Sequence, residues 1–120
     1  MAFIAANPEL YLGKKVGSGD CVALVQTIAN APSTAIWRPG IQVVTASSTL
    51  ITKGTVIATL TDGFYPTPPS DGHAAIYLGQ DHDNIYVLDQ WVGQPVHYRK
   101  ISYLASLIKR DDASAFFVVE

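Results

Sequence analysis

The spacing of apolar residues changes near residue 54, and the two parts of the chain predict different elements. Between about residues 20 and 30, apolar side chains recur at intervals of three and four, which is the period of an amphipathic helix. Asp20 or Ser18 is the natural N-cap of this helix, and Asn30, which precedes an Ala-Pro pair, ends it. The first third of the chain is therefore predicted to be helical.

The remainder of the N-terminal part is less regular. A short helix is predicted at residues 7–10, because Asn7 can cap it and Pro8 suits the first helical position. Residues 32–53 have no sustained period, and only residues 41–44 resemble a short strand. We therefore expect an ordered loop between the main helix and the elements that follow.

From residue 54 onward the pattern favours strands that are rich in β-branched and aromatic residues and separated by polar turns. The expected strands are 54–60, 73–79, 84–91, 94–101 and 114–120, with a short helix at 102–112. The short polar turn between the second and third strands predicts an antiparallel hairpin. Together these elements predict an α+β fold in which N-terminal helices pack on a meandering antiparallel sheet.

Length and composition are those of a globular domain. The 120 residues are 48% hydrophobic and 15% charged, with a net charge of −2. A chain of this length buries one core, so we expect a single domain over residues 1–120. The net charge does not fit a protein that binds by neutralising phosphates, and the apolar runs are too short to cross a membrane. We therefore predict neither nucleic-acid binding nor membrane insertion.

The counts of cysteine and histidine argue against a metal centre. The chain has one cysteine and three histidines, and the histidines lack the spacing of a zinc-binding motif. We predict no metal and no cofactor. Residues 1–15 lack the basic start and the long apolar stretch of a signal peptide, so action outside the cytoplasm needs another export route.

The lone cysteine lies where a thiol becomes reactive. Cys21 follows a glycine-containing segment, residues 17–20, and opens the predicted helix. Unpaired N–H groups and the positive end of the helix dipole stabilise a thiolate there, and these N–H groups can also bind an oxyanion. The alternative is an inert, buried side chain, which is the usual state of a free cysteine. Its position makes Cys21 a candidate nucleophile.

A cysteine nucleophile needs a base within hydrogen-bonding reach. His73 is the best candidate, because it opens a strand directly after a proline-rich loop and should lie at one end of the sheet. The alternative is a surface histidine at a junction between loop and strand. His82 fits a solvated turn, and His97 fits a partly exposed strand position.

The base in turn needs a group that orients it. In an antiparallel hairpin the start of the first strand faces the end of the second, so His73 should lie opposite Asp89, Gln90 or Trp91. Asp89 is the predicted orienting residue, since a carboxylate within an apolar strand requires a partner. Gln90 stays open as the alternative, because the register is not fixed by the sequence.

These residues resemble a known pattern. Asp20-Cys21 at the helix start, KGTVIAT in the first strand and HAAIYLG beginning at His73 are similar to the CHAP and NlpC families of papain-like cysteine amidases and peptidases. The resemblance covers roughly residues 10–101. It implies a papain-like fold, peptidoglycan hydrolysis, and catalytic roles for Cys21, His73 and Asp89.

The chain departs from the NlpC pattern in two places. Val22 follows the cysteine where NlpC members usually have serine. NlpC members also have a tyrosine before the cysteine that helps to stabilise the oxyanion, and Tyr11 is the candidate counterpart here. The order of cysteine before histidine is that of the hydrolases and differs from that of the permuted acyltransferases of the superfamily.

The small size of the chain and the missing signal peptide resemble amidase effectors that the type VI secretion system delivers into rival bacteria. The resemblance implies synthesis in the bacterial cytoplasm and action in the periplasm of a target cell. It also implies contact with a component of the secretion apparatus and a cognate immunity protein that protects the producer.

The sequence therefore predicts a cysteine amidase or endopeptidase that cleaves amide bonds in peptidoglycan peptides. Residues 61–72 and Trp91 are expected to border its substrate groove, and Asp20 and Gln90 to contribute, with Tyr11, to binding of the oxyanion or substrate. The alternatives are that residues 61–72 form a rigid surface loop and that Trp91 is the end of a packed strand. Two alternatives stay open. One is a module on the same fold that binds wall peptides without turnover, and the other is an acyltransferase or deamidase.

Overall fold

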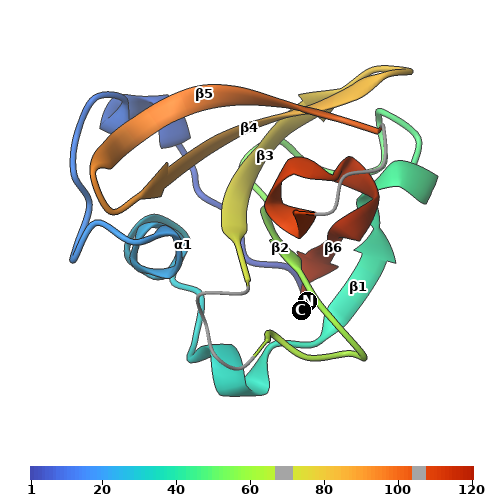
Figure 1. Cartoon of the computed structure of the whole chain (residues 1–120), viewed down its shortest axis with the longest axis horizontal. Helices are drawn as coiled ribbons and strands as arrows, with labels where there is room; N and C mark the ends of the chain where they lie inside the picture. Colours follow the sequence, from blue (N-terminus) through green and yellow to red (C-terminus); the bar gives the residue numbers. More distant parts are fainter. Residues whose placement is uncertain (67–71, 104–107) are drawn as a thin grey trace.

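The computed structural model describes residues 1–66, 72–103 and 108–120. These residues contain one α-helix, α1 (Cys21–Ala29), and a six-stranded sheet (Figure 1). The strands are β1 (Pro39–Gln42), β2 (Val56–Thr59), β3 (Ala74–Gln80), β4 (Asn84–Trp91), β5 (Gln94–Ser102) and β6 (Phe116–Val119). The predicted α+β fold with an antiparallel sheet is confirmed.

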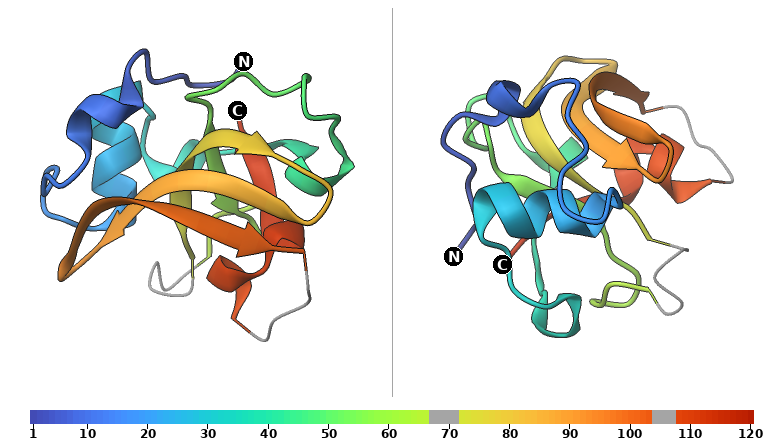
Figure 2. Two further views of the ribbon diagram at one scale, coloured as in Figure 1. Left: turned by 90° about the horizontal axis from the view of Figure 1, so that it is seen from above. Right: turned by 90° about the vertical axis from the view of Figure 1, so that its left-hand side faces the viewer.

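The sheet has the strand order β1-β6-β2-β3-β4-β5, and all its pairs are antiparallel. The C-terminal strand β6 therefore lies between β1 and β2, while β3, β4 and β5 form a meander that ends one edge of the sheet. Figure 2 shows α1 packed against the sheet near this meander. The N-terminus of α1 consequently faces the end of β4 and the start of β3.

The centre of the sheet, at β2 and the first half of β3, is buried on both faces. Residues alternate along β3, so Ala74 and Ile76 pack in the core cluster that contains α1, and Ala75 and Tyr77 pack in the cluster on the opposite face. A strand buried on both sides reads as a continuous apolar run, and this explains the composition of β2 and β3. The same alternation decides which side chains at the strand ends can reach α1.

Helix α1 forms as its sequence predicts. Asp20 is the N-cap and accepts a hydrogen bond from the Ala23 amide at 2.7 Å, and Asn30 ends the helix in the left-handed conformation. Leu24, Val25 and Ala29 face the core. A capping side chain of this kind contributes about 1 kcal/mol, and it fixes where the helix begins. Cys21 is therefore the first helical residue.

Two predictions for the N-terminal part, one helix and one strand, need correction. Residues Pro8–Tyr11 form a 3-10 helix, η1, and the Asn7 side chain does not cap it. The expected strand at 41–44 is shifted, because β1 ends at Gln42 and the 3-10 helix η3 (Val43–Thr45) follows. Short 3-10 turns require less regular apolar spacing than α-helices, so periodicity does not distinguish them from other irregular structure.

The predicted helix at 102–112 falls partly outside the described residues. Within the described part, Ser102 ends β5 and η5 (Lys109–Asp111) is a 3-10 turn, followed by η6 (Ala113–Ala115). The remaining short element is η2 (Thr34–Ile36). In the described part of the chain, no helix is long and apolar enough to cross a membrane.

Candidate active site

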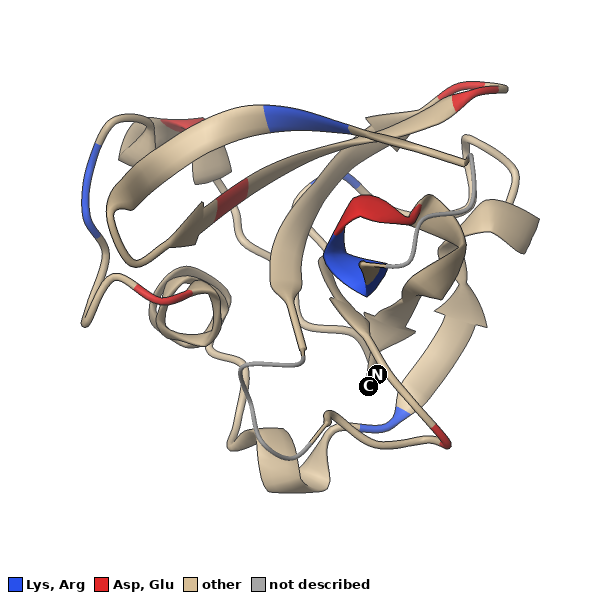
Figure 3. Ribbon diagram, viewed as in Figure 1, with Lys and Arg blue, Asp and Glu red and all other residues tan. Residues whose placement is uncertain are grey.

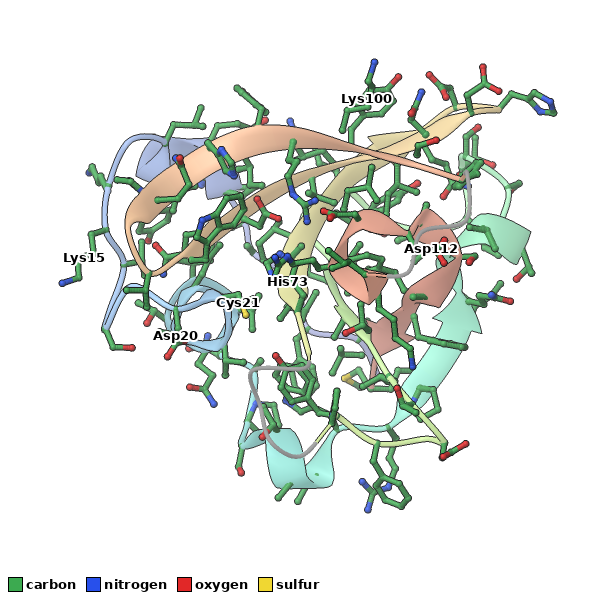
Figure 4. All side chains as sticks on the ribbon, in the orientation of Figure 1. Lys15, Asp20, Cys21, His73, Lys100 and Asp112 are labelled. Carbon is green, nitrogen blue, oxygen red and sulfur yellow. The ribbon has the colours of Figure 1, made fainter. Side chains whose placement is uncertain are left out.

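Cys21 lines a groove of about 820 Å³. The groove extends between the start of α1, the end of β4, the segment before β3, and η5. Its lining includes Val22, Tyr65, His73, Trp91, Val92 and Arg110. The Cys21 side chain is half-buried, and its sulfur points toward His73 (Figure 4). The structure thus places the thiol where a substrate can reach it, as the sequence predicted.

The conformation of the loop that leads into Cys21 depends on two glycines and on one buried side chain. Gly17 and Gly19 have φ angles of +57° and +91°, which side-chain-bearing residues rarely adopt. The fully buried Gln90 side chain holds both ends of this loop. Its Nε2 donates to the Val16 and Asp20 carbonyls, each at 2.8 Å, and its Oε1 accepts from the Val16 amide at 3.0 Å. The predicted alternative orienting residue therefore contacts the backbone that carries the thiol.

His73 is positioned by β2. Its amide donates to Thr59 Oγ1 at 3.0 Å, and its carbonyl accepts from the Thr59 amide at 2.9 Å. The imidazole is buried edge-on between the rings of Trp91 and Phe116, with ring centroids 6.3 and 6.4 Å away. His73 Nε2 lies 2.7 Å from Asp89 Oδ2, so Nδ1 is the ring nitrogen left to interact with the Cys21 sulfur.

Asp89 is fully buried, and three side chains approach it. Arg99 Nε donates to Oδ2 at 2.8 Å, on the same oxygen as His73. His97, which pairs with Asp89 across β4 and β5, places Nε2 2.9 Å from Oδ1, although this contact lacks the alignment of a hydrogen bond. Arg99 also donates to Asp111 at 3.1 Å. The carboxylate is therefore surrounded by positively charged or titratable groups.

The register explains which neighbour meets His73. The pairs Ile76–Leu88 and Tyr77–Val87 align β3 with β4. Continued to the strand ends, this register puts Asp89 diagonal to His73 on one face and turns Gln90 to the face that packs on α1. The sequence narrowed the choice to these two residues, and the alternation of the strand assigns each to a different partner.

The charges of the three residues shift their pKa values together. Burial raises the pKa of the Cys21 thiol, but the hydrogen bond and charge of His73, with the Ala74 amide and Tyr65, outweigh burial and lower it. Burial lowers the pKa of His73, but Asp89 and Cys21 raise it above its usual value. Burial likewise raises the pKa of Asp89, and His73 and Arg99 lower it further than burial raises it. All three shifts favour a thiolate beside an imidazolium.

Tyr65 is the site residue that sequence reasoning did not single out. Its hydroxyl lies 3.8 Å from the Cys21 sulfur, and its ring packs edge-on against Trp37 with centroids 5.1 Å apart. A side chain at Gly72 would lie 2.6 Å from the Tyr65 ring, so the absence of one lets the ring settle there. Tyr65 belongs to the segment 61–72 that was expected to border the groove, and its closeness to Cys21 depends on tertiary contacts.

The remaining predicted residues lie in different places. Tyr11, in η1, packs against the core beside α1 and is not a groove residue. Asp20 lines the groove, but its carboxylate is engaged by the Ala23 amide and by the Ser18 hydroxyl at 3.1 Å. Trp91, 42% exposed, forms a groove wall as expected. Within the described ranges, no group of three or more metal-ligating side chains is placed to hold a metal ion.

A half-buried thiol at a helix start, a histidine on the first strand of a hairpin and a carboxylate on the next are the arrangement of a papain-like cysteine amidase. Comparison with protein families gives the narrower assignment. Residues 1–119 match the model of the domesticated amidase effector 2 family, and the chain belongs to that family. The predicted amidase, and the resemblance to a type VI secretion amidase effector, are thereby confirmed.

Individual relatives agree with this assignment. The chain is 36% identical to the type VI secretion amidase effector 2 protein of Salmonella typhi over the full length of both chains. It is 40% identical to domesticated amidase effector 2 of Ixodes scapularis over 82% of this chain and 70% of the relative. The solved structure of type 6 secretion amidase effector 2 (Tae2) superposes with a TM-score of 0.86 at 33% identity, covering 98% of this chain and 94% of the other.

Proposed function

We propose that residues 1–120 form one catalytic domain that hydrolyses amide bonds in peptidoglycan peptides, with Cys21, His73 and Asp89 as its catalytic residues. The observation that carries this proposal is the chain of contacts from the Cys21 sulfur through the His73 ring to the buried Asp89 carboxylate, at 2.7 Å for the last contact. The groove that contains the sulfur is large enough for a peptide.

The proposed reaction passes through a thioester. The Cys21 thiolate attacks the amide carbonyl, and the developing oxyanion is bound by the Cys21 backbone N–H at the helix start and by the Tyr65 hydroxyl. The His73 imidazolium gives its proton to the leaving amine. Water then attacks the thioester while His73 accepts a proton from it, and the acid product leaves as the thiolate returns. Asp89 keeps His73 oriented throughout.

The names of the relatives support a biological setting for this reaction. The names of two relatives include type VI secretion, so we propose that this system exports the chain and that its substrate is the wall of a target bacterium. The site of action is then the target periplasm, and the producer needs an immunity protein that blocks the enzyme. Peptidoglycan is the amide-rich polymer of that compartment, which fits an amidase delivered there.

The first test is digestion of purified peptidoglycan by the intact chain and by its Cys21→Ala variant. We expect the intact chain to release new amine and carboxyl ends in equal number, and Cys21→Ala to release neither while still binding the fragments. Turnover by Cys21→Ala equal to that of the intact chain would exclude the thioester route. Transfer of the acyl group to an amine rather than to water would indicate an acyltransferase.

The second test concerns the compartment. The chain is expressed in a bacterium either in the cytoplasm or fused to a periplasmic export signal, with Cys21→Ala as the matched control. We expect lysis only from the exported, intact chain. Equal toxicity from the cytoplasmic form would contradict action on the wall.

A further inference from the structure

The charged side chains of the catalytic groove are almost all paired with one another. Asp20 accepts from the Ala23 amide and the Ser18 hydroxyl. Arg99 donates to Asp89 and Asp111. Within the part of the chain that the structure describes, each of these side chains therefore has hydrogen-bond partners of its own.

Arg110 is the exception. It lines the same groove, and no described residue accepts a hydrogen bond from its guanidinium or forms an ion pair with it. The carboxylate of its neighbour Asp111 is engaged by Arg99 at 3.1 Å. Figure 3 shows the basic and acidic positions of this turn next to one another along the ribbon. Among the described charged side chains of the groove, the Arg110 guanidinium is thus the one whose hydrogen-bond donors have no described partner.

The turn that carries Arg110 is held by contacts at three successive residues, Lys109, Arg110 and Asp111. The Arg110 carbonyl accepts from Arg99 Nη2 at 2.9 Å, and the Asp111 carboxylate accepts from Arg99 Nη1. On the other side, Lys109 Nζ donates to Thr61 Oγ1 at 2.8 Å. Arg99 also holds Asp89, so the turn that presents Arg110 is anchored by the arginine that supports the catalytic carboxylate.

The rest of the groove lining is largely apolar. Val22, Trp91 and Val92 form the wall on the side of α1 and the β4–β5 hairpin. A guanidinium beside such a surface binds a carboxylate more strongly than one in open water, and its planar fork matches both carboxylate oxygens. An exposed arginine that has no internal partner is therefore well placed to bind an anionic substrate group.

We propose that Arg110 is a specificity-determining residue that binds a free carboxylate on the substrate peptide next to the amide that is cleaved. This inference rests on the proposed function and extends it to the class of substrate. Stem peptides of peptidoglycan carry free carboxylates on side chains and at chain ends, whereas their amidated forms carry carboxamides. The enzyme then prefers peptides whose carboxylates are free.

The test is a double-mutant cycle between the enzyme and its substrate. Arg110→Gln and Arg110→Lys are compared with the intact chain on wall fragments whose carboxylates are free and on the same fragments after chemical amidation. Lys100→Gln is the matched control, because Lys100 is an exposed cation on β5 outside the groove (Figure 4). All variants should keep the melting temperature of the intact chain, since the Arg110 guanidinium has no internal partner to lose.

We expect amidation to raise the KM of the intact chain and of Lys100→Gln by about 10- to 100-fold, the usual effect of one charge-assisted hydrogen bond. Arg110→Gln should show the same rise on free carboxylates and no further rise on amidation, with kcat nearly unchanged. Arg110→Lys should be intermediate, since an ammonium lacks the planar fork.

The proposal is overturned if amidation has equal effects on the intact chain and Arg110→Gln, or if Arg110→Gln cleaves free-carboxylate fragments with an unchanged KM. Fragment binding to Cys21→Ala and to the Cys21→Ala, Arg110→Gln double variant tests it without turnover. If the intact chain cleaves no wall fragment, the proposed function fails. Carboxylate-dependent binding that is lost with Arg110 would still support the role of Arg110, and equal binding by both variants would reject it.

Discussion

Gln90 and Asp20 lie 70 residues apart in the chain and are joined by a 2.8 Å hydrogen bond from the Gln90 amide to the Asp20 carbonyl. The same amide also binds the Val16 backbone. The buried Gln90 side chain thus holds the two ends of the loop that precedes Cys21. It also connects this loop to β4, the strand that carries Asp89. Gln90 is therefore a positioning residue, acting through the backbone of the nucleophile.

Gln90→Glu should loosen this loop, because a carboxylate keeps the size of the amide but cannot donate to the two carbonyls. A buried carbonyl left without a donor costs about 1–3 kcal/mol. We expect a lower urea midpoint, by that free energy, and a fall in kcat, because the loop that positions the Cys21 thiol is less well held. Gln94→Glu is the control, because the Gln94 amide binds only the exposed Pro95 carbonyl. A Gln90→Glu variant with the stability and kcat of the intact chain would rule out the positioning role.

The sequence predicted the elements that carry the site better than the contacts between them. Helix α1, its Asp20 cap and the hairpin of β3 and β4 follow from local apolar spacing and capping chemistry. The pairing of His73 with Asp89 was reduced to a choice between neighbours by hairpin geometry. The choice between Asp89 and Gln90 needed the register of β3 and β4. A local sequence pattern does not give this register, and a shift of one residue would exchange the two faces of the strand.

Tyr65 and Arg110 were beyond the reach of local patterns. Tyr65 reaches Cys21 only because it packs on Trp37 and because Gly72 leaves room for its ring. Arg110 lines the groove because Arg99, on β5, and Thr61, in the segment after β2, hold its turn in place. Both positions depend on contacts between segments far apart in the chain. The choice of Tyr11 followed the order of residues in related families, whereas the structure places a tyrosine from another segment beside the sulfur.

Tyr65→Phe should separate the chemical role of the hydroxyl from the packing of the ring. The phenyl ring keeps its place against Trp37, while the group 3.8 Å from the sulfur is removed. We expect kcat to fall by about 10²-fold with little change in KM, as for the loss of one oxyanion donor. Single-turnover kinetics on a chromogenic amide would measure this, with Tyr98→Phe on exposed β5 as the control. A parallel rise in KM with unchanged kcat would instead assign Tyr65 to substrate binding.

Asp89→Asn should weaken both catalysis and the acid dependence of stability. The pKa of Asp89 lies below its usual 3.8, where burial is outweighed by His73 and Arg99. A carboxylate with a lowered folded pKa stabilises the fold fully above the unfolded value, and this contribution is lost as the pH falls through the folded value. Removing one member of a buried charged group costs about 3–5 kcal/mol.

Urea unfolding of Asp89→Asn between pH 7 and pH 2, by circular dichroism, should therefore show a deficit that is largest above about pH 5 and narrows below it. Activity should fall at every pH, because the asparagine cannot stabilise the imidazolium that forms during the reaction. Asp62→Asn, at an exposed position, is the control. A deficit that stays constant down to pH 2 would mean that Asp89 stabilises the fold by packing and not by charge.

His73→Ala should slow the alkylation of Cys21 at neutral pH. Burial raises the pKa of the Cys21 thiol, and His73 supplies the hydrogen bond and charge that bring the pKa below its usual 9.0. Without the imidazole, burial dominates and the pKa should rise above that value. The thiolate fraction well below the pKa falls about tenfold for each unit by which the pKa rises.

Iodoacetamide labelling of the folded chain from pH 5 to pH 10 should therefore show the rate profile of His73→Ala displaced to higher pH. His82→Ala, in the exposed turn between β3 and β4, should keep the profile of the intact chain. Superimposable profiles for His73→Ala and the intact chain would show that the histidine does not share its proton with the thiol, and the proposed thiolate mechanism would have to be abandoned.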